Sequence, residues 1–232
     1  MVWVLIEFVK RWVARMKISI LCTDPHHPVI NSLQLWINEI SLKGHSPVLI
    51  FDKADLQGGD ILFLVSCSQM IRDAERKKYK ATLVLHASDL PKGRGWSPHI
   101  WSILGGGNQI TVSLLEASEP VDSGVIWLKT KFNLEGHELL PEINAKLFAA
   151  ELSLMTHAVE QFEAIKTIEQ AGDPGSYMPK RLPENSQLDP NKTIAEQFDL
   201  LRIVDSQRYP AFFNYRGKRY LLKIEKVENE QQ

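Results

Sequence analysis

KISILCTDPHHPVINSLQLWINEISLKGHSPVLIF, residues 17–51, decides the fold class of this 232-residue chain. It opens with a short apolar run (17–22) and closes with a second one (46–51). Between them, residues 28–44 place apolar side chains at helical spacing and end on Gly44, a residue typical of helix C-termini. Two strands joined by a helix pair in parallel through a right-handed crossover. We therefore predict a strand–helix–strand unit of a parallel sheet.

Alternating strand and helix patterns continue after residue 51. Nearly all-apolar runs at 60–66 and 81–86 predict strands covered on both faces. We expect two further strands at 108–117 and 125–132, a long helix from about 138 to 170, an irregular connection after Gly172, a helix over 193–205 capped by Thr193 with Glu196, and a hairpin around Arg216-Gly217. The prediction is an α/β fold with an open, mostly parallel sheet (17–172) and a small C-terminal helix-plus-hairpin subdomain (173–232).

Composition excludes several classes of protein. Apolar residues make up 44% and charged residues 24% of the chain, and the formal charge is −1, so it lacks the basic field of a nucleic-acid-binding protein. Cys22 and Cys67 match no metal-ligand spacing and are interpreted as buried thiols in a reducing compartment. We expect a cytoplasmic protein with no metal, nucleic acid or membrane as partner.

The first residues (1–16) are interpreted as an N-terminal extension of doubtful status. The apolar run MVWVLIEFVKRWVAR (1–15) carries charges and is far shorter than the roughly 20 residues of a membrane span. No positive charge precedes the run and no small-residue cleavage site follows it, unlike in a signal peptide. Either a translation-start artefact or an amphipathic extension explains the segment.

Two polar residues occupy positions where open parallel sheets place their sites. His86 ends the fourth predicted strand, and Asp122 lies in a tight loop at the entrance of a later one. A carboxylate beside a histidine orients the ring and raises its pKa, which lets the ring move protons near neutral pH. We predict that this pair is catalytic, while His99 and His157 are interpreted as structural.

Around these two residues, several fixed positions recur in a specific order. They are His86, Ser88, Leu90, Pro91, Gly93, Gly95, Pro98, Gly106, Thr111, Asp122, Gly124 and Ile126. This pattern resembles the folate-dependent formyltransferase superfamily. Further matches in the C-terminal part, at Arg181, Pro183, Ser186, Leu188, Leu200, Arg202 and 209–212, resemble sugar N-formyltransferases. The amino-acid sequence of residues 86–101 is most similar to that of the branch of enzymes that acts on nucleotide-linked amino sugars, including enzymes of pseudaminic-acid-type pathways.

The resemblance implies a Rossmann-like transferase that moves a formyl group from 10-formyltetrahydrofolate to the primary amine of a nucleotide-linked amino deoxysugar, in surface polysaccharide biosynthesis. His86 then acts as acid/base, and Asp122 is its partner. The resemblance assigns the folate to Ser68, Gln69, Met70, Ile71, Glu116, Ser118 and Val121. From their own chemistry, we expect Lys92 and Arg94 to hold a diphosphate and Trp96 to stack on a sugar or base, with Ser88 as a further substrate contact.

One position departs from the family pattern. Val84 stands where the family usually has an asparagine that donates a hydrogen bond to the developing oxyanion. Losing such a donor typically costs about 2.7–4 kcal/mol. Another donor, such as a backbone N–H, Ser88 or Asn108, could replace it. Alternatively, protonated His86 serves instead, or the chain is a non-catalytic relative.

Other functions remain open at this point. A methionyl-tRNA formyltransferase would need a basic C-terminal barrel, whereas only about sixty residues of balanced charge follow Gly172. Because Val84 replaces the usual asparagine, a third possibility is a folate-binding or partner-binding relative without turnover. A fourth possibility is hydrolysis of the formyl group. The long helix and the C-terminal hairpin are surfaces through which two copies could form a homodimer.

Overall fold

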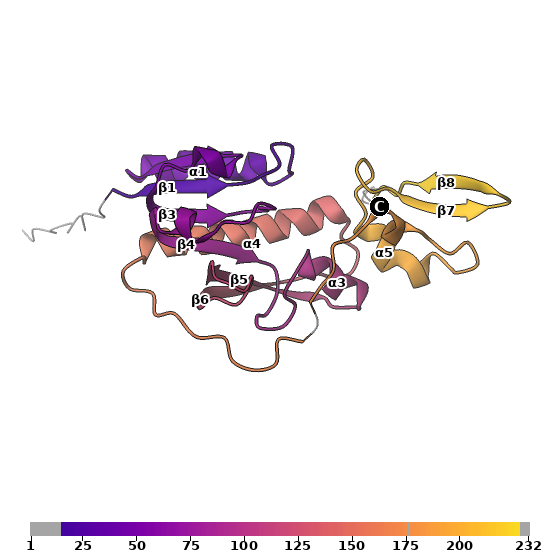
Figure 1. Cartoon of the computed structure of the whole chain (residues 1–232). Helices are drawn as coiled ribbons and strands as arrows, with labels where there is room; N and C mark the ends of the chain where they lie inside the picture. Colours follow the sequence, from indigo (N-terminus) through magenta and orange to yellow (C-terminus); the bar gives the residue numbers. More distant parts are fainter. Residues whose placement is uncertain (1–14, 176, 228–232) are drawn as a thin grey trace, which may run out of the picture.

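A six-stranded sheet organises the computed structural model, which describes residues 15–175 and 177–227 (Figure 1). The strand order is β2-β1-β3-β4-β5-β6. The first four strands in this order pair in parallel, and β5 is antiparallel to both of its neighbours, β4 and β6. This arrangement confirms the predicted α/β fold with a mostly parallel sheet. The strands are β1 (Lys17–Leu21), β2 (Ser46–Ile50), β3 (Gly59–Leu64), β4 (Tyr79–His86), β5 (Gln109–Glu116) and β6 (Ile126–Asn133). The predicted N-terminal extension lies, up to residue 14, outside the described residues.

Two helices, α1 (Ile30–Leu42) and α4 (Leu140–Glu160), pack with the central strands in one hydrophobic core. Ile20, Phe63 and Leu83 contribute to this core from the sheet, and all three are fully buried. The indole of Trp36 on α1 donates a 2.8 Å hydrogen bond to Thr156 on α4. Shorter helical elements are η1 (Lys53–Asp55), α2 (Asp73–Arg76), α3 (Pro98–Leu104), η2 (Pro183–Ser186), η3 (Ala195–Gln197) and α5 (Phe198–Arg202).

The predicted helix from 138 to 170 is wrong in its last ten residues, 161–170. The helix α4 ends at Glu160, although the apolar period continues through Phe162 and Ile165. Those side chains still pack on the core, with the Phe162 ring 5.5 Å from that of Trp127, but the backbone has left the helix. Ile168 instead pairs with Ile126 through two backbone hydrogen bonds of 2.8 and 2.9 Å. The periodicity marks which side chains are buried, and the backbone pairing with the edge of β6 overrides it.

The C-terminal hairpin is confirmed: β7 (Ala211–Tyr215) and β8 (Lys218–Leu222) pair antiparallel around Arg216-Gly217 and extend away from the sheet (Figure 1). The predicted helix over 193–205 is shorter and divided, because η3 precedes the single helical turn and a half of α5. Its predicted cap is present, since the backbone N–H of Glu196 donates to the Thr193 hydroxyl and the Glu196 carboxylate accepts from Thr193.

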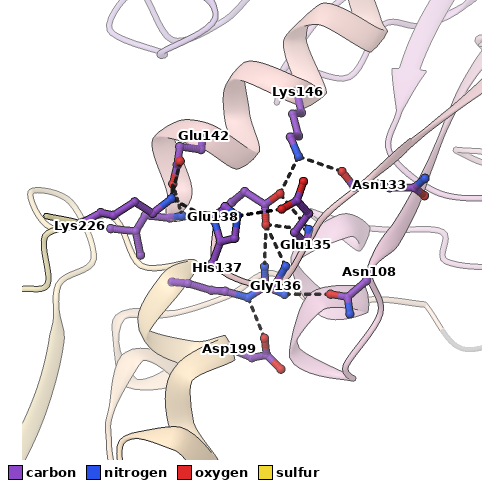
Figure 2. Close-up of polar contacts among 12 residues, drawn as sticks. Asn108, Asn133, Glu135, Gly136, His137, Glu138, Glu142, Lys146, Asp199 and Lys226 are labelled. Carbon is purple, nitrogen blue, oxygen red and sulfur yellow. Dashed lines mark hydrogen bonds and ion pairs between the residues drawn. The ribbon is translucent and has the colours of Figure 1, made fainter. Parts of the chain in front are cut away.

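A buried charge cluster attaches this C-terminal part to the sheet (Figure 2). Glu138 is 2% exposed, and Arg202 of α5, 1% exposed, places a guanidinium nitrogen 3.9 Å from its carboxylate. Burial raises the pKa of Glu138, but Lys146 at 2.6 Å and the backbone N–H groups of Glu135 and Gly136 outweigh it and bring the pKa to about 2. The Glu138 carboxyl group therefore remains ionised although it is buried, and its interactions with these partners stabilise the junction.

Within the part of the chain that the structure describes, no helix is long and apolar enough to cross a membrane.

Candidate functional site

A cavity of about 690 Å³ opens where β3 and β4 end. The loops after β1 and β3, the segment 95–100, the loop after β5 and one side of α4 line it, and residues of the C-terminal part complete its wall. Ligands of open α/β sheets bind outside the carboxyl ends of the strands, and cavities of this volume hold small molecules. The cavity therefore occupies the position at which the sequence predicts a site.

The structure brings His86 and Asp122 together in this cavity, where both are more than nine-tenths buried. The Nδ1 atom of His86 lies 3.7 Å from Oδ1 of Asp122, and its Nε2 atom lies 2.8 Å from the carbonyl oxygen of Gly93. A carbonyl oxygen only accepts, so in the neutral ring the proton belongs on Nε2. This leaves the Nδ1 lone pair beside the Asp122 carboxylate, where an acquired proton would be stabilised.

The loop between β5 and β6 holds Asp122 in place. Asp122 adopts the left-handed conformation (φ 60°), and its Oδ2 accepts a 3.0 Å hydrogen bond from the backbone N–H of Gly95. The Gln170 amide donates to the carbonyl oxygens of Asp122 and Gly124 at 2.9 and 2.8 Å. A Cβ at Gly124 would overlap the carbonyl oxygen of Glu116, so the close approach of the two strands requires glycine there.

All seven residues predicted to hold the folate line the same cavity. Side chains in this group are used to fix the loops: Gln69 bonds to Asp52 and to the backbone of Lys53, and Ser68 to Thr23. Burial raises the pKa of Glu116, whose carboxylate accepts from Trp127 at 2.9 Å. Apolar Leu64, Ile71, Val84 and Ala117 share the wall, so a flat heterocycle would meet an apolar surface edged by main-chain groups. The residues present fit a pterin; they are Ser68, Gln69, Met70, Ile71, Glu116, Ser118 and Val121.

Of the four residues predicted to bind the substrate, one lines the cavity and three do not. Trp96 lines the cavity and is 40% exposed, whereas Ser88, Lys92 and Arg94 are not part of its wall. Arg94 instead donates to the side chain of Gln170 at 3.1 Å, on the outer side of the Asp122 loop. Its guanidinium therefore supports the loop in the structure.

Cationic and aromatic residues of the C-terminal part form a wall that the sequence reasoning did not assign. The Lys180 ammonium lies 5.0 Å from the centre of the Trp96 ring, and Arg208 bridges to Asp24 of the β1 loop at 3.3 Å. Their signal in the sequence was a set of basic and aromatic residues within an irregular, proline-rich connection. The wall consists of Tyr177, Lys180, Arg181, Arg208 and Tyr209.

Two titratable residues of the wall, Glu151 and His99, were also missed. Glu151 of α4 faces the cavity, and burial raises its pKa to about 8. Its signal was a carboxylate within the apolar stripe, four residues after Leu147. His99, interpreted as structural, lies in the wall with His86. Among the described residues, no group of three or more His, Cys, Asp or Glu side chains is arranged to hold a metal ion.

No family model matches the chain. Its sequence relatives include several methionyl-tRNA formyltransferases and a bifunctional polymyxin resistance protein ArnA from Wigglesworthia glossinidia brevipalpis, which is 27% identical over 133 residues, 56% of this chain and 20% of the relative. A methionyl-tRNA formyltransferase from Finegoldia magna is 27% identical over 133 residues, which are 57% of this chain and 43% of the relative. A second one, from Rickettsia massiliae, is 26% identical over 211 residues, 90% of this chain and 67% of the relative. The alignment thus spans about two fifths of the length of the first of these relatives.

Solved structures share the fold over nearly the whole chain. Methionyl-tRNA formyltransferase from Clostridium thermocellum superposes with a TM-score of 0.77 at 22% identity, covering 93% of this chain and 95% of that one. HypX from Aquifex aeolicus in complex with tetrahydrofolic acid gives 0.76 at 24%, covering 91% and 38%. A sugar N-formyltransferase from a Shewanella species gives 0.66 at 14%, covering 92% and 99%. These likenesses show that the chain has the fold of these formyltransferases and of HypX.

Proposed function

We propose that this chain transfers a formyl group from 10-formyltetrahydrofolate to a primary amine in the cavity beside β4. The observation that carries the proposal is the pairing of His86 with Asp122, whose facing atoms are 3.7 Å apart, next to the slot formed by 66–71 and 116–121. The fold shared with formyltransferases supports the same chemistry. When bound, the folate would supply an activated formyl group on N10.

The amine proton is taken up at one defined atom. Because Gly93 holds the Nε2–H of His86, Nδ1 is the atom free to accept the proton that the attacking amine loses. Asp122 stabilises the resulting imidazolium across 3.7 Å, and Gly95 keeps that carboxylate in position. His86 then returns the proton to N10 as the bond between the formyl carbon and N10 breaks, so the protonation state of the enzyme is restored.

For the acceptor, we propose a nucleotide-linked amino deoxysugar. The cavity wall next to the catalytic pair combines aromatic surfaces with cations, the combination that binds a base and phosphates. Trp96 and Tyr177 supply rings, while Lys180 and Arg181 supply positive charge. A sugar N-formyltransferase among the structural neighbours supports this class of substrate.

Methionyl-tRNA is the second candidate, because the relatives from Finegoldia magna and Rickettsia massiliae act, by name, on that molecule. The formal charge of −1 argues against tRNA as the substrate, since binding an RNA backbone requires an excess of Lys and Arg. Incubation with 10-formyltetrahydrofolate and either acceptor separates the two, with tetrahydrofolate release and product mass as readouts. We expect formylation of a nucleotide-linked amino sugar. Formylation of methionyl-tRNA alone, with a steep salt dependence, would overturn the assignment of the acceptor.

A further inference from the structure

His99 lines the catalytic cavity and has a ring nitrogen that makes no hydrogen bond among the described residues. The residue lies in the first turn of α3, after Ser97 and Pro98, and shares the cavity wall with His86. Its Nδ1 atom is shielded from solvent and has no hydrogen-bond partner among the described residues. Buried polar atoms are normally paired, so the unpaired Nδ1 bears on which of the two ring nitrogens carries the proton.

The protonation state of His99 follows from its surroundings. Burial and, after it, the positive charge of a protonated His86 lower the pKa of the His99 ring to about 4, so the ring is neutral at pH 7. A neutral imidazole carries one N–H group and one lone pair. An N–H group at the shielded Nδ1 would be a buried donor without an acceptor, at a cost of about 1–3 kcal/mol. Orphaned buried N–H groups are rarer in proteins than orphaned buried acceptors, so the proton belongs on Nε2 and the lone pair on the shielded Nδ1.

The site needs a neutral donor at this place. When an amine attacks the formyl carbon, negative charge develops on the formyl oxygen, and preorganised donors stabilise it. Val84 faces the cavity with an apolar side chain. Two side chains considered as substitutes do not reach the cavity, because Ser88 lies outside its wall and the Asn108 amide oxygen accepts from Arg202 at 3.4 Å.

We propose that neutral His99 donates a hydrogen bond from Nε2–H to the formyl oxygen as it becomes an oxyanion. This role rests on the proposed formyl transfer and adds a group to it. No proton leaves His99 in the step: the amine nitrogen bonds to the formyl carbon, its proton passes through Nδ1 of His86, and the bond to N10 breaks. A neutral donor suits this position because a second cation beside His86 would oppose the protonation of that ring.

Two substitutions at this position separate a donor from a packing residue. His99→Leu introduces an apolar side chain of similar size and removes the donor. We therefore expect kcat to fall about 100- to 1000-fold with little change in KM for the folate. His99→Gln restores an N–H donor, and we expect it to recover at least tenfold of the loss. His137→Leu, at an exposed site in the loop before α4, is the matched control. An active wild-type enzyme whose kcat is unchanged in His99→Leu would overturn the proposal.

A binding measurement tests the donor without turnover. In ¹⁵N-histidine-labelled protein at pH 7, we expect the His99 ring to be the neutral tautomer with its proton on Nε2. A non-transferable folate analogue that carries an N10-formyl group should shift the Nε2 resonance more than the same folate without that group. A protonated ring, the Nδ1–H tautomer, or equal shifts would contradict the role of His99. Absence of formyl transfer by the wild type would instead count against the proposed function.

Discussion

At the scale of single residues, the chemistry depends on which nitrogen of His86 holds the proton. The 2.8 Å contact to the Gly93 carbonyl fixes Nε2 as the donor, so the working atom is Nδ1, beside Asp122. The buried carboxyl of Glu151 differs, because it forms no ion pair among the residues that the structure describes and burial raises its pKa to about 8. Asp122 is held beside His86 by the backbone N–H of Gly95, whereas burial favours the neutral acid at Glu151.

The substitution Glu151→Gln tests this at the level of stability. Between its ordinary pKa near 4.5 and the raised value of about 8, the folded protein keeps a proton that the unfolded chain has lost. The stability of the wild type must therefore decline as pH rises through this window. A glutamine cannot ionise, so we expect Glu151→Gln to gain at least about 1 kcal/mol on the wild type between pH 5 and pH 8. Denaturant unfolding at several pH values measures the difference, and parallel pH profiles of the two proteins would refute it.

At the scale of elements, the hairpin of β5 and β6 carries the catalytic carboxylate. Its loop is held by Gln170 from the segment after α4 and by the close approach of Gly124 to Glu116. The position of Asp122 thus depends on backbone contacts that involve three separate parts of the chain.

Gly124→Ala is expected to disturb this loop. The added methyl group would overlap the Glu116 carbonyl oxygen, so the strands must separate, at a cost of about 1–3 kcal/mol typical of overpacking. Thermal unfolding and formyl transfer should both suffer. Gly105→Ala is the control, because its Cβ would meet nothing closer than 3.4 Å and its φ of −86° suits alanine. Wild-type stability in Gly124→Ala would show that the loop is looser than described.

At the scale of the whole molecule, the cavity is completed by a part of the chain that is distant in sequence. Residues 177–209 form one wall of it, and the Glu138–Arg202 pair attaches that part to the sheet. The described contacts make the binding site and the junction interdependent, since Ile203, next to Arg202, also lines the cavity.

Glu138→Gln tests the junction. Removing one charge of a buried pair leaves Arg202 without compensation on that side, and we expect a loss of about 3 kcal/mol in the free energy of unfolding. Because the folded pKa of about 2 lies below the ordinary 4.5, this contribution is present above pH 4.5 and is lost as pH falls toward 2. Glu135→Gln, an exposed neighbour, should change little. Equal unfolding midpoints for the two variants at pH 7 would contradict the account.

The sequence predicted the elements that depend on local patterns and missed those that depend on distant partners. The strands up to β6 and the hairpin of β7 and β8 were recognisable from apolar runs and turn residues. The end of α4 was not, because Ile168 leaves the helix to pair with Ile126. In the same way, the motif indicated His86 and Asp122, while the direction of Arg94 depends on Gln170, 76 residues away. The domain boundary after Gly172 and a homodimer stay predictions.

The most direct test of the central claim is a double-mutant cycle on the catalytic pair, measured as single-turnover formyl transfer. His86→Asn and Asp122→Asn should each lower the rate about 10²- to 10⁴-fold while folate binding persists. Because the two side chains act as one unit, we predict that the double variant is no slower than the slower single variant. Losses that multiply in the double variant, or single variants that keep the wild-type rate, would contradict the account.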